Sequence, residues 1–318
     1  MTSLPSTPET GDASSGPAPS RRRLLLGAGA TAGALLGSLA VGSGAYAAPG
    51  SGTHTAPARR PRRTAAHDVV VTADSVTAPA RVPAGPVSFR VSTPTEGGMG
   101  LPLVQVSVPI DQYLDDLTRM TNAATPAEAA AAAAVVERES VNLGGAAVQP
   151  GTDATFSQIL WPGRYYLIAY DFDGSARPVA HALTVDGPGY CEPPEPVDVI
   201  RHTPSGFWVP GGQLRASGTH LIVNDSGLLN EAVLLPVRPG TTAAEVDAFF
   251  AALRDGTAPP SYPITGGAVG SPPLSPGRSA RLGLSLPPGG YLLSSWITSS
   301  TTGRPRAFDG FYKLVTLT

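Results

Sequence analysis

Apolar and polar residues alternate along several short stretches of the chain. Residues 87–92, 104–108 and 282–286 each place every second side chain on one face. This alternation predicts β-strands with one buried and one wetted face, as in an antiparallel sandwich. The 37 glycines and 34 prolines favour many turns and short strands over long helices.

Two segments have a helical period instead, residues 125–140 and 242–255. Each opens on a threonine with a glutamate three residues later, the pattern of a capping box. The second segment is expected to pack through one apolar face. That face consists of Val246, Phe249, Phe250 and Leu253. The carboxylates of Asp115, Asp116, Glu137 and Glu139 are interpreted as solvated helix charges.

The chain also contains an internal repeat, because two Pro-Gly dipeptides recur 126 residues later in register. An apolar run containing tyrosine follows the second dipeptide of each half. Upstream, Gly144-Gly145 is matched to Gly266-Gly267. The matched dipeptides are Pro150-Gly151 with Pro276-Gly277, and Pro162-Gly163 with Pro288-Gly289. We therefore predict two domains of the same architecture, residues 68–187 and 203–318, joined by a proline-rich linker over 188–202.

The first 47 residues have the pattern of an export signal. Arg21 and Arg22 precede an uncharged run over 24–47, which ends with Ala45 and Ala47 in the small-x-small pattern of a cleavage site. The segment resembles a twin-arginine signal peptide. Residues 48–67 are expected to form a basic, proline-rich tail. The predicted location is secreted or cell-wall associated, with membrane contact only through the signal before cleavage.

Charge and cysteine content exclude several classes of protein. The formal net charge of −2 gives no reason to expect nucleic acid as a partner. Cys191 is the single cysteine, so a disulfide within the chain and multi-cysteine zinc sites are excluded. It either pairs between chains or is a free thiol; we favour a free thiol without a role, and Cys191 is the candidate if the chain has a reactive thiol. No Gly-x-Ser-x-Gly elbow, phosphate loop or His-Glu-x-x-His motif occurs.

Both halves resemble cupredoxin-like domains, the β-sandwich of blue-copper proteins. In the second half, residues 217–224 resemble the strand that ends in the family's asparagine. Residues 288–293 resemble the strand before the copper cysteine, and residues 303–310 resemble the loop that carries the last two ligands. The resemblance implies an all-β fold of two tandem Greek-key β-sandwiches, each with one inserted α-helix.

The four ligand positions of the family hold other residues in the second half. A blue-copper site needs two imidazoles, a thiolate and a weak axial methionine. Carried over by the resemblance, the two histidine positions hold Asn230 and Arg306, the cysteine position holds Ser295, and the methionine position holds Phe311. In the first half the cysteine position falls near Ala169. We therefore expect no metal and no cofactor.

Three functional hypotheses follow. The favoured one is an exported, non-enzymatic protein with two metal-free cupredoxin-like domains, acting as a binding module for an unknown protein or cell-envelope partner. The alternative is a copper-binding or electron-transfer protein with a site built from Met99, His181 and Cys191. The third is an exported enzyme with a polar site that no motif reveals.

Overall fold

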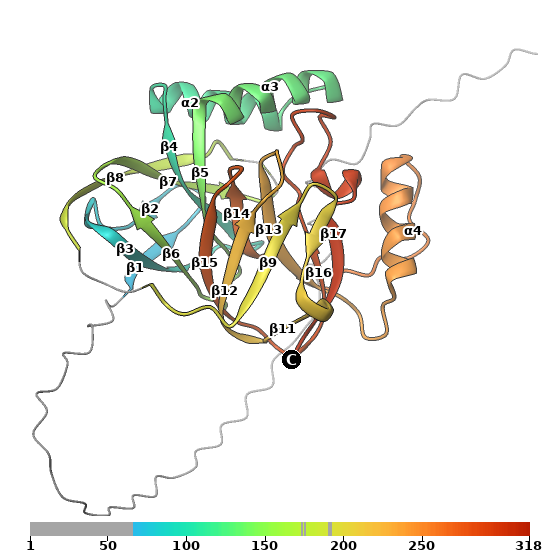
Figure 1. The fold of residues 1–318 in the computed structure, drawn as a ribbon. Coiled ribbons are helices and arrows are strands. Elements are labelled where there is room, and N and C mark those ends of the chain that lie inside the picture. Colours follow the sequence, from blue (N-terminus) through green and yellow to red (C-terminus); the bar gives the residue numbers. More distant parts are fainter. Residues whose placement is uncertain (1–65, 173, 175, 190–192) are drawn as a thin grey trace, which may run out of the picture.

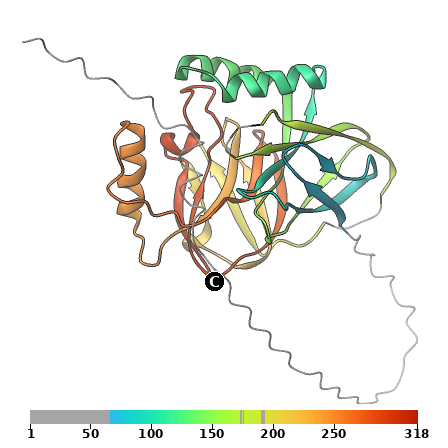
Figure 2. The same ribbon diagram turned by 180° about the vertical axis from the view of Figure 1, so that it is seen from behind.

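The computed structural model describes residues 66–172, 174, 176–189 and 193–318, and these form two facing β-sheets with helices outside them (Figures 1 and 2). The all-β sandwich predicted from the alternating pattern is confirmed. The strands of the first half are β1 (His67–Val71), β2 (Val76–Thr77), β3 (Arg81–Ser92), β4 (Met99–Val106), β5 (Ser140–Val148), β6 (Ala154–Leu160), β7 (Gly163–Asp171) and β8 (Val179–Pro188).

The second half repeats this order of strands and their pairings. β1 pairs with β3 in parallel and β3 with β6 in antiparallel, just as β9 pairs with β12 and β12 with β15. The remaining strands are β9 (Asp198–Thr203), β10 (Gly206–Trp208), β11 (Gln213–Leu214), β12 (Ser217–Asn224), β13 (Asn230–Pro236), β14 (Val269–Leu274), β15 (Ser279–Ser285), β16 (Gly289–Ser294) and β17 (Tyr312–Leu317). Two short 3-10 turns complete this half, Pro210–Gly212 and Arg306–Asp309.

The glycine match between the halves is different from the expected one. Gly145 lies opposite Pro102 of β4, and Gly270 lies opposite Val233 of β13, at irregularities in corresponding strand pairs. A Cβ at either glycine would collide with the backbone of the neighbouring strand. Gly145 therefore corresponds to Gly270, and the match of Gly144-Gly145 to Gly266-Gly267 was wrong.

The two halves are joined edge to edge through both sheets. β5 pairs with β14 in one sheet, and β6 pairs with β15 in the other, both antiparallel. Phe156 lies opposite Leu282, which is its equivalent in the repeat, 126 residues further along. An approximate two-fold axis therefore passes through this pair and relates the first half to the second. One hydrophobic core consequently runs through both halves, from Val69 to Leu317.

The expected tail and linker are both shorter in the structure. His67, assigned to the tail, begins β1 and contacts the ring of Phe89. β8 extends to Pro188, and residues 198–202, assigned to the linker, form most of β9. These residues pair in parallel with β12, so they belong to the second half. The sequence of residues 198–202 does not alternate between apolar and polar residues, so it gave no strand signal.

The first half carries two helices, so the expectation of one inserted helix per half was wrong there. The helices are α2 (Ile110–Thr121), α3 (Pro126–Glu139) and α4 (Ala243–Arg254). α3 begins with the predicted capping box between Thr125 and Glu128. At α4 the Thr242 side chain accepts from the Glu245 amide, and the Glu245 carboxylate also contacts Arg238 and Ser261.

Within the residues that the structure describes, no helix is long and apolar enough to cross a membrane.

Candidate functional site

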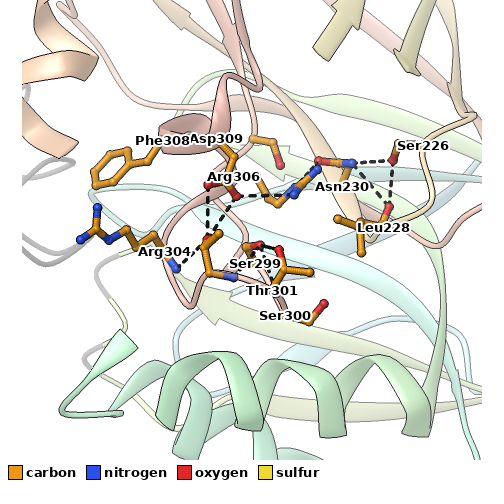
Figure 3. A network of polar contacts seen from close by, with 12 residues as sticks. Ser226, Leu228, Asn230, Ser299, Ser300, Thr301, Arg304, Arg306, Phe308 and Asp309 are labelled. Carbon is orange, nitrogen blue, oxygen red and sulfur yellow. Dashed lines mark hydrogen bonds and ion pairs between the residues drawn. The ribbon is translucent and has the colours of Figure 1, made fainter. Parts of the chain in front are cut away.

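The four positions matched to copper ligands meet in space at one end of the second half, and Figure 3 shows two of them, Asn230 and Arg306. Asn230 begins β13, Ser295 follows β16, Arg306 begins a 3-10 turn, and Phe311 precedes β17. All four side chains are at most 5% exposed. We call these four residues the Arg306 cluster. Sequence reasoning identified each of them, and the fold brings them together.

Arg306 is the centre of this cluster. Its Nε donates a hydrogen bond to Asn230 Oδ1 at 3.3 Å. Its guanidinium carbon lies 3.9 Å from the centre of the Phe311 ring, in a cation–π contact. Its Nη1 lies 3.5 Å from Asp309 Oδ2. Burial lowers the pKa of Arg306, whereas the carboxylates of Asp309 and Glu137 act in the opposite direction.

The other polar members are held by the strands around them. Asn230 Nδ2 donates to Ser226 Oγ at 2.7 Å (Figure 3). Ser295 accepts a hydrogen bond from the Glu231 amide at its Oγ, 3.2 Å away. The Ser295 amide donates to the carbonyl of Phe311 at 3.0 Å. Ser295 thus links β13, β16 and the segment before β17 through hydrogen bonds.

A carboxylate from the first half reaches this end of the second half. Glu137 of α3 accepts a hydrogen bond from Ser300 Oγ at 2.9 Å. Burial raises the pKa of Glu137, and the Ser300 hydrogen bond and the charge of Arg306 oppose that shift. The interpretation of the helix carboxylates as solvated is therefore corrected for Glu137, and also for Asp116, which is only 4% exposed.

The donor set does not fit a blue-copper ion. A guanidinium is permanently charged and has no lone pair to offer a cation. Asn230 and Ser295 supply amide and hydroxyl oxygens, which copper of this type does not select over thiolate and imidazole. Phe311 supplies a ring face that Arg306 already covers. The interactions that fill this space are those of an internal ion pair and its hydrogen bonds.

The corresponding positions of the first half are mainly apolar. Ala169, matched to the cysteine position, lies near the end of β7 and is buried in the core. Met99 begins β4 at the place where Asn230 begins β13, and it is fully buried in the core. No group of three His, Cys, Asp or Glu side chains suited to a metal ion occurs in the described part of the chain.

The alternative copper set is not assembled by the described residues. Met99 lies opposite Asp171 at the start of β4, whereas His181 lies opposite Leu167 in β8. The ring of His181 contacts the carbonyl of Pro79 at 3.3 Å. Other positions lie outside the described residues: Cys191, Arg21, Arg22, Ala45 and Ala47.

A buried histidine next to the Arg306 cluster was not recognised from the sequence, which assigned His202 to the linker. Its Nδ1 lies 3.3 Å from the Val223 carbonyl, and its Nε2 lies 3.1 Å from the Glu231 carbonyl. A neutral imidazole can donate from only one nitrogen, so one of these contacts lacks a proton. Burial, the larger effect, lowers the pKa of His202 to about 4.

The lowered pKa of His202 predicts a loss of stability in acid. The unfolded chain takes up a proton below pH 6.5, whereas the folded protein does so only near pH 4. We expect this histidine to remove about 3 kcal/mol of stability between these two pH values. Urea unfolding at several pH values, compared with His202→Gln, measures the contribution. An equal pH dependence in both proteins would contradict the prediction.

Comparisons with known proteins return structures but no sequence relatives. No protein-family model matches the chain, and no curated protein matches it. Among solved structures, auracyanin B is 21% identical, covering 40% of this chain and 91% of its own, with a TM-score of 0.24. A multicopper oxidase is 11% identical, covering 81% and 93%, with a TM-score of 0.21. A copper nitrite reductase from Nitrosomonas europaea is 12% identical, covering 79% and 93%, with a TM-score of 0.19.

Proposed function

We propose that this chain is an exported, non-enzymatic protein in which two metal-free cupredoxin-like domains act as a binding module at the cell envelope. The observation that carries the proposal is the position of Arg306. Its guanidinium is buried among the residues matched to copper ligands, where it contacts Asn230, Asp309 and Phe311. Binding a cation there would require the displacement of this charge or the burial of two cations together, which is unfavourable.

The sequence supports the other parts of this proposal. Arg21 and Arg22, with the Ala45–Ala47 cleavage pattern, support export by the twin-arginine route. The continuous core supports a rigid scaffold, because the two halves share both sheets. The partner is a protein or a component of the cell envelope, and nucleic acid is not expected from the near-neutral charge.

Copper binding tests the proposal directly. The purified protein is mixed with excess copper, dialysed, and measured for metal by mass spectrometry and for visible absorption. We expect less than about a tenth of an equivalent and no thiolate-to-copper band, because Arg306 and Phe311 supply no metal ligand. Copper bound near one equivalent would contradict the proposal and favour the alternative set with Cys191.

A matched variant shows whether the assay detects a site at this place. It carries Asn230→His, Ser295→Cys, Arg306→His and Phe311→Met, which together introduce the family's four ligands. We expect this variant to bind about one copper with a visible charge-transfer band, provided that its circular dichroism matches the parent protein. A folded variant without copper would show that these positions were matched wrongly.

A further inference from the structure

A cavity lies beneath the helices of the first half and next to the Arg306 cluster, since the Ile297 carbonyl in its wall accepts a hydrogen bond from the Arg306 amide. Its volume is about 300 Å³, at the lower end of the range for small-molecule sites. α2 and α3 cover the end of the sandwich at this place, as Figure 1 shows. Residues of the second half, Leu229, Pro273 and Ile297, also line it, so the cavity forms only where both halves meet.

The walls of this cavity are mainly apolar. α2 contributes Leu117 and Met120, and β7 contributes Ile168. Leu117 and Met120 are only partly buried, although they pack against the core cluster under the helices. An apolar side chain that faces an open space lacks the dispersion contacts it would have in a filled core. Filling the space with an apolar molecule would supply those contacts.

Several polar groups in the wall are paired within the protein. Tyr113 Oη donates to Ser140 Oγ at 3.2 Å, and Asn142 Nδ2 donates to the same oxygen at 2.9 Å. Arg177 forms an ion pair with Asp115 at 2.8 Å. Asp171 Oδ2 accepts from the Ala176 amide at 3.1 Å. Among the described residues of the wall, the one basic side chain, Arg177, is paired with Asp115, so it is not available to compensate an anionic ligand.

We propose that this cavity binds a small, neutral and largely apolar molecule, held between α2, β7 and the second half. Ordered water is a poor occupant, because a buried water needs two to four polar partners and the walls are mainly apolar. The inference does not depend on the Arg306 cluster, so it stands or fails separately from the metal-free function proposed above.

Fluorescence titration of the purified protein with N-phenyl-1-naphthylamine, a neutral apolar probe, tests this site. We expect saturable binding of one probe per chain. The variant Leu117→Trp fills the cavity from α2 and is expected to weaken binding at least tenfold while its melting temperature stays within a few degrees. If that variant does not fold, Met120→Trp on the same wall provides the test.

Two controls separate the cavity from other apolar surface. Ile159→Ala changes an exposed side chain, 52% accessible, on the outside of the sandwich, and binding is expected to stay unchanged. The anionic probe 8-anilinonaphthalene-1-sulfonate is expected to bind at least tenfold more weakly than the neutral one. Absence of saturable binding, unchanged binding in the filled variant, or equal binding of the two probes would overturn the inference.

Discussion

Replacing Phe156 with alanine is expected to lower the free energy of unfolding by about 3–5 kcal/mol, the cost of removing a buried phenylalanine. Phe156 is fully buried and stacks on Phe89 with ring centres 5.0 Å apart. It also lies opposite Leu282 at the two-fold axis. The cavity left by the substitution would therefore weaken both halves at once.

The same substitution tests whether the halves unfold as one unit. Because both sheets and one core pass through the junction, we expect a single calorimetric transition that shifts as a whole. Hydrogen exchange followed by mass spectrometry should show equal losses of protection in β3 and β12. Two separate transitions, with only the first shifted by Phe156→Ala, would contradict the continuous core.

Trp161→Ala is the matched control for this experiment. Trp161 follows β6, the strand that contains Phe156, yet it is 75% exposed. Its removal takes away an aromatic ring of larger size without opening a cavity. We expect a change within about 0.5 kcal/mol, as is usual for surface substitutions.

Replacing Arg306 with alanine is expected to cost about 3 kcal/mol, because it leaves Asp309 and Glu137 without their cation and removes the contact with Phe311. Arg306→Lys keeps the charge but loses the planar group that lies over the ring, and we expect about half of this cost. Urea unfolding at neutral pH measures both variants.

Arg304→Ala controls for the general effect of removing an arginine from this loop. Arg304 is exposed, and its Nη1 makes only a long hydrogen bond of 3.4 Å to the Arg254 carbonyl. We expect a change of less than about 0.5 kcal/mol. Equal costs for Arg304→Ala and Arg306→Ala would show that the buried ion pair adds nothing to stability.

Local patterns in the sequence predicted much of the fold. The alternation over 87–92 and 282–286 lies in β3 and β15, and the threonine–glutamate spacing located the start of α3. The aspartates of α2 were interpreted as helix charges, but no helix range was predicted there, although Ile110, Tyr113, Leu114 and Leu117 have helical spacing. One of these aspartates, Asp116, is buried.

The junction between the halves could not be read from local patterns. Every residue of β14 is buried, so both faces of this strand are covered. The sequence of that strand, with two prolines, does not alternate and gives no strand signal. The pairing of β5 with β14 joins residues more than 120 positions apart, and only the three-dimensional arrangement reveals it.

Some residues of the candidate site were identified from the sequence, and others were recognised only in the structure. The residues of the Arg306 cluster were singled out by short motifs, and the structure brings them into contact at one end of the second half. The contribution of Glu137 was not foreseen, since its partner Ser300 lies 163 residues away in the other half. His202 was placed in a linker, because residues 198–202 follow three closely spaced prolines and do not alternate between apolar and polar residues.

The two-fold junction has a consequence for assembly. A polypeptide consisting of one half alone would expose β5 and β6 as unpaired strands, and unpaired strands associate readily. The surface that complements them is their own equivalent turned by two-fold symmetry, as in an isologous dimer. The chain therefore has the arrangement of a dimer whose two subunits are joined covalently. Because both halves belong to one polypeptide, their association does not depend on protein concentration.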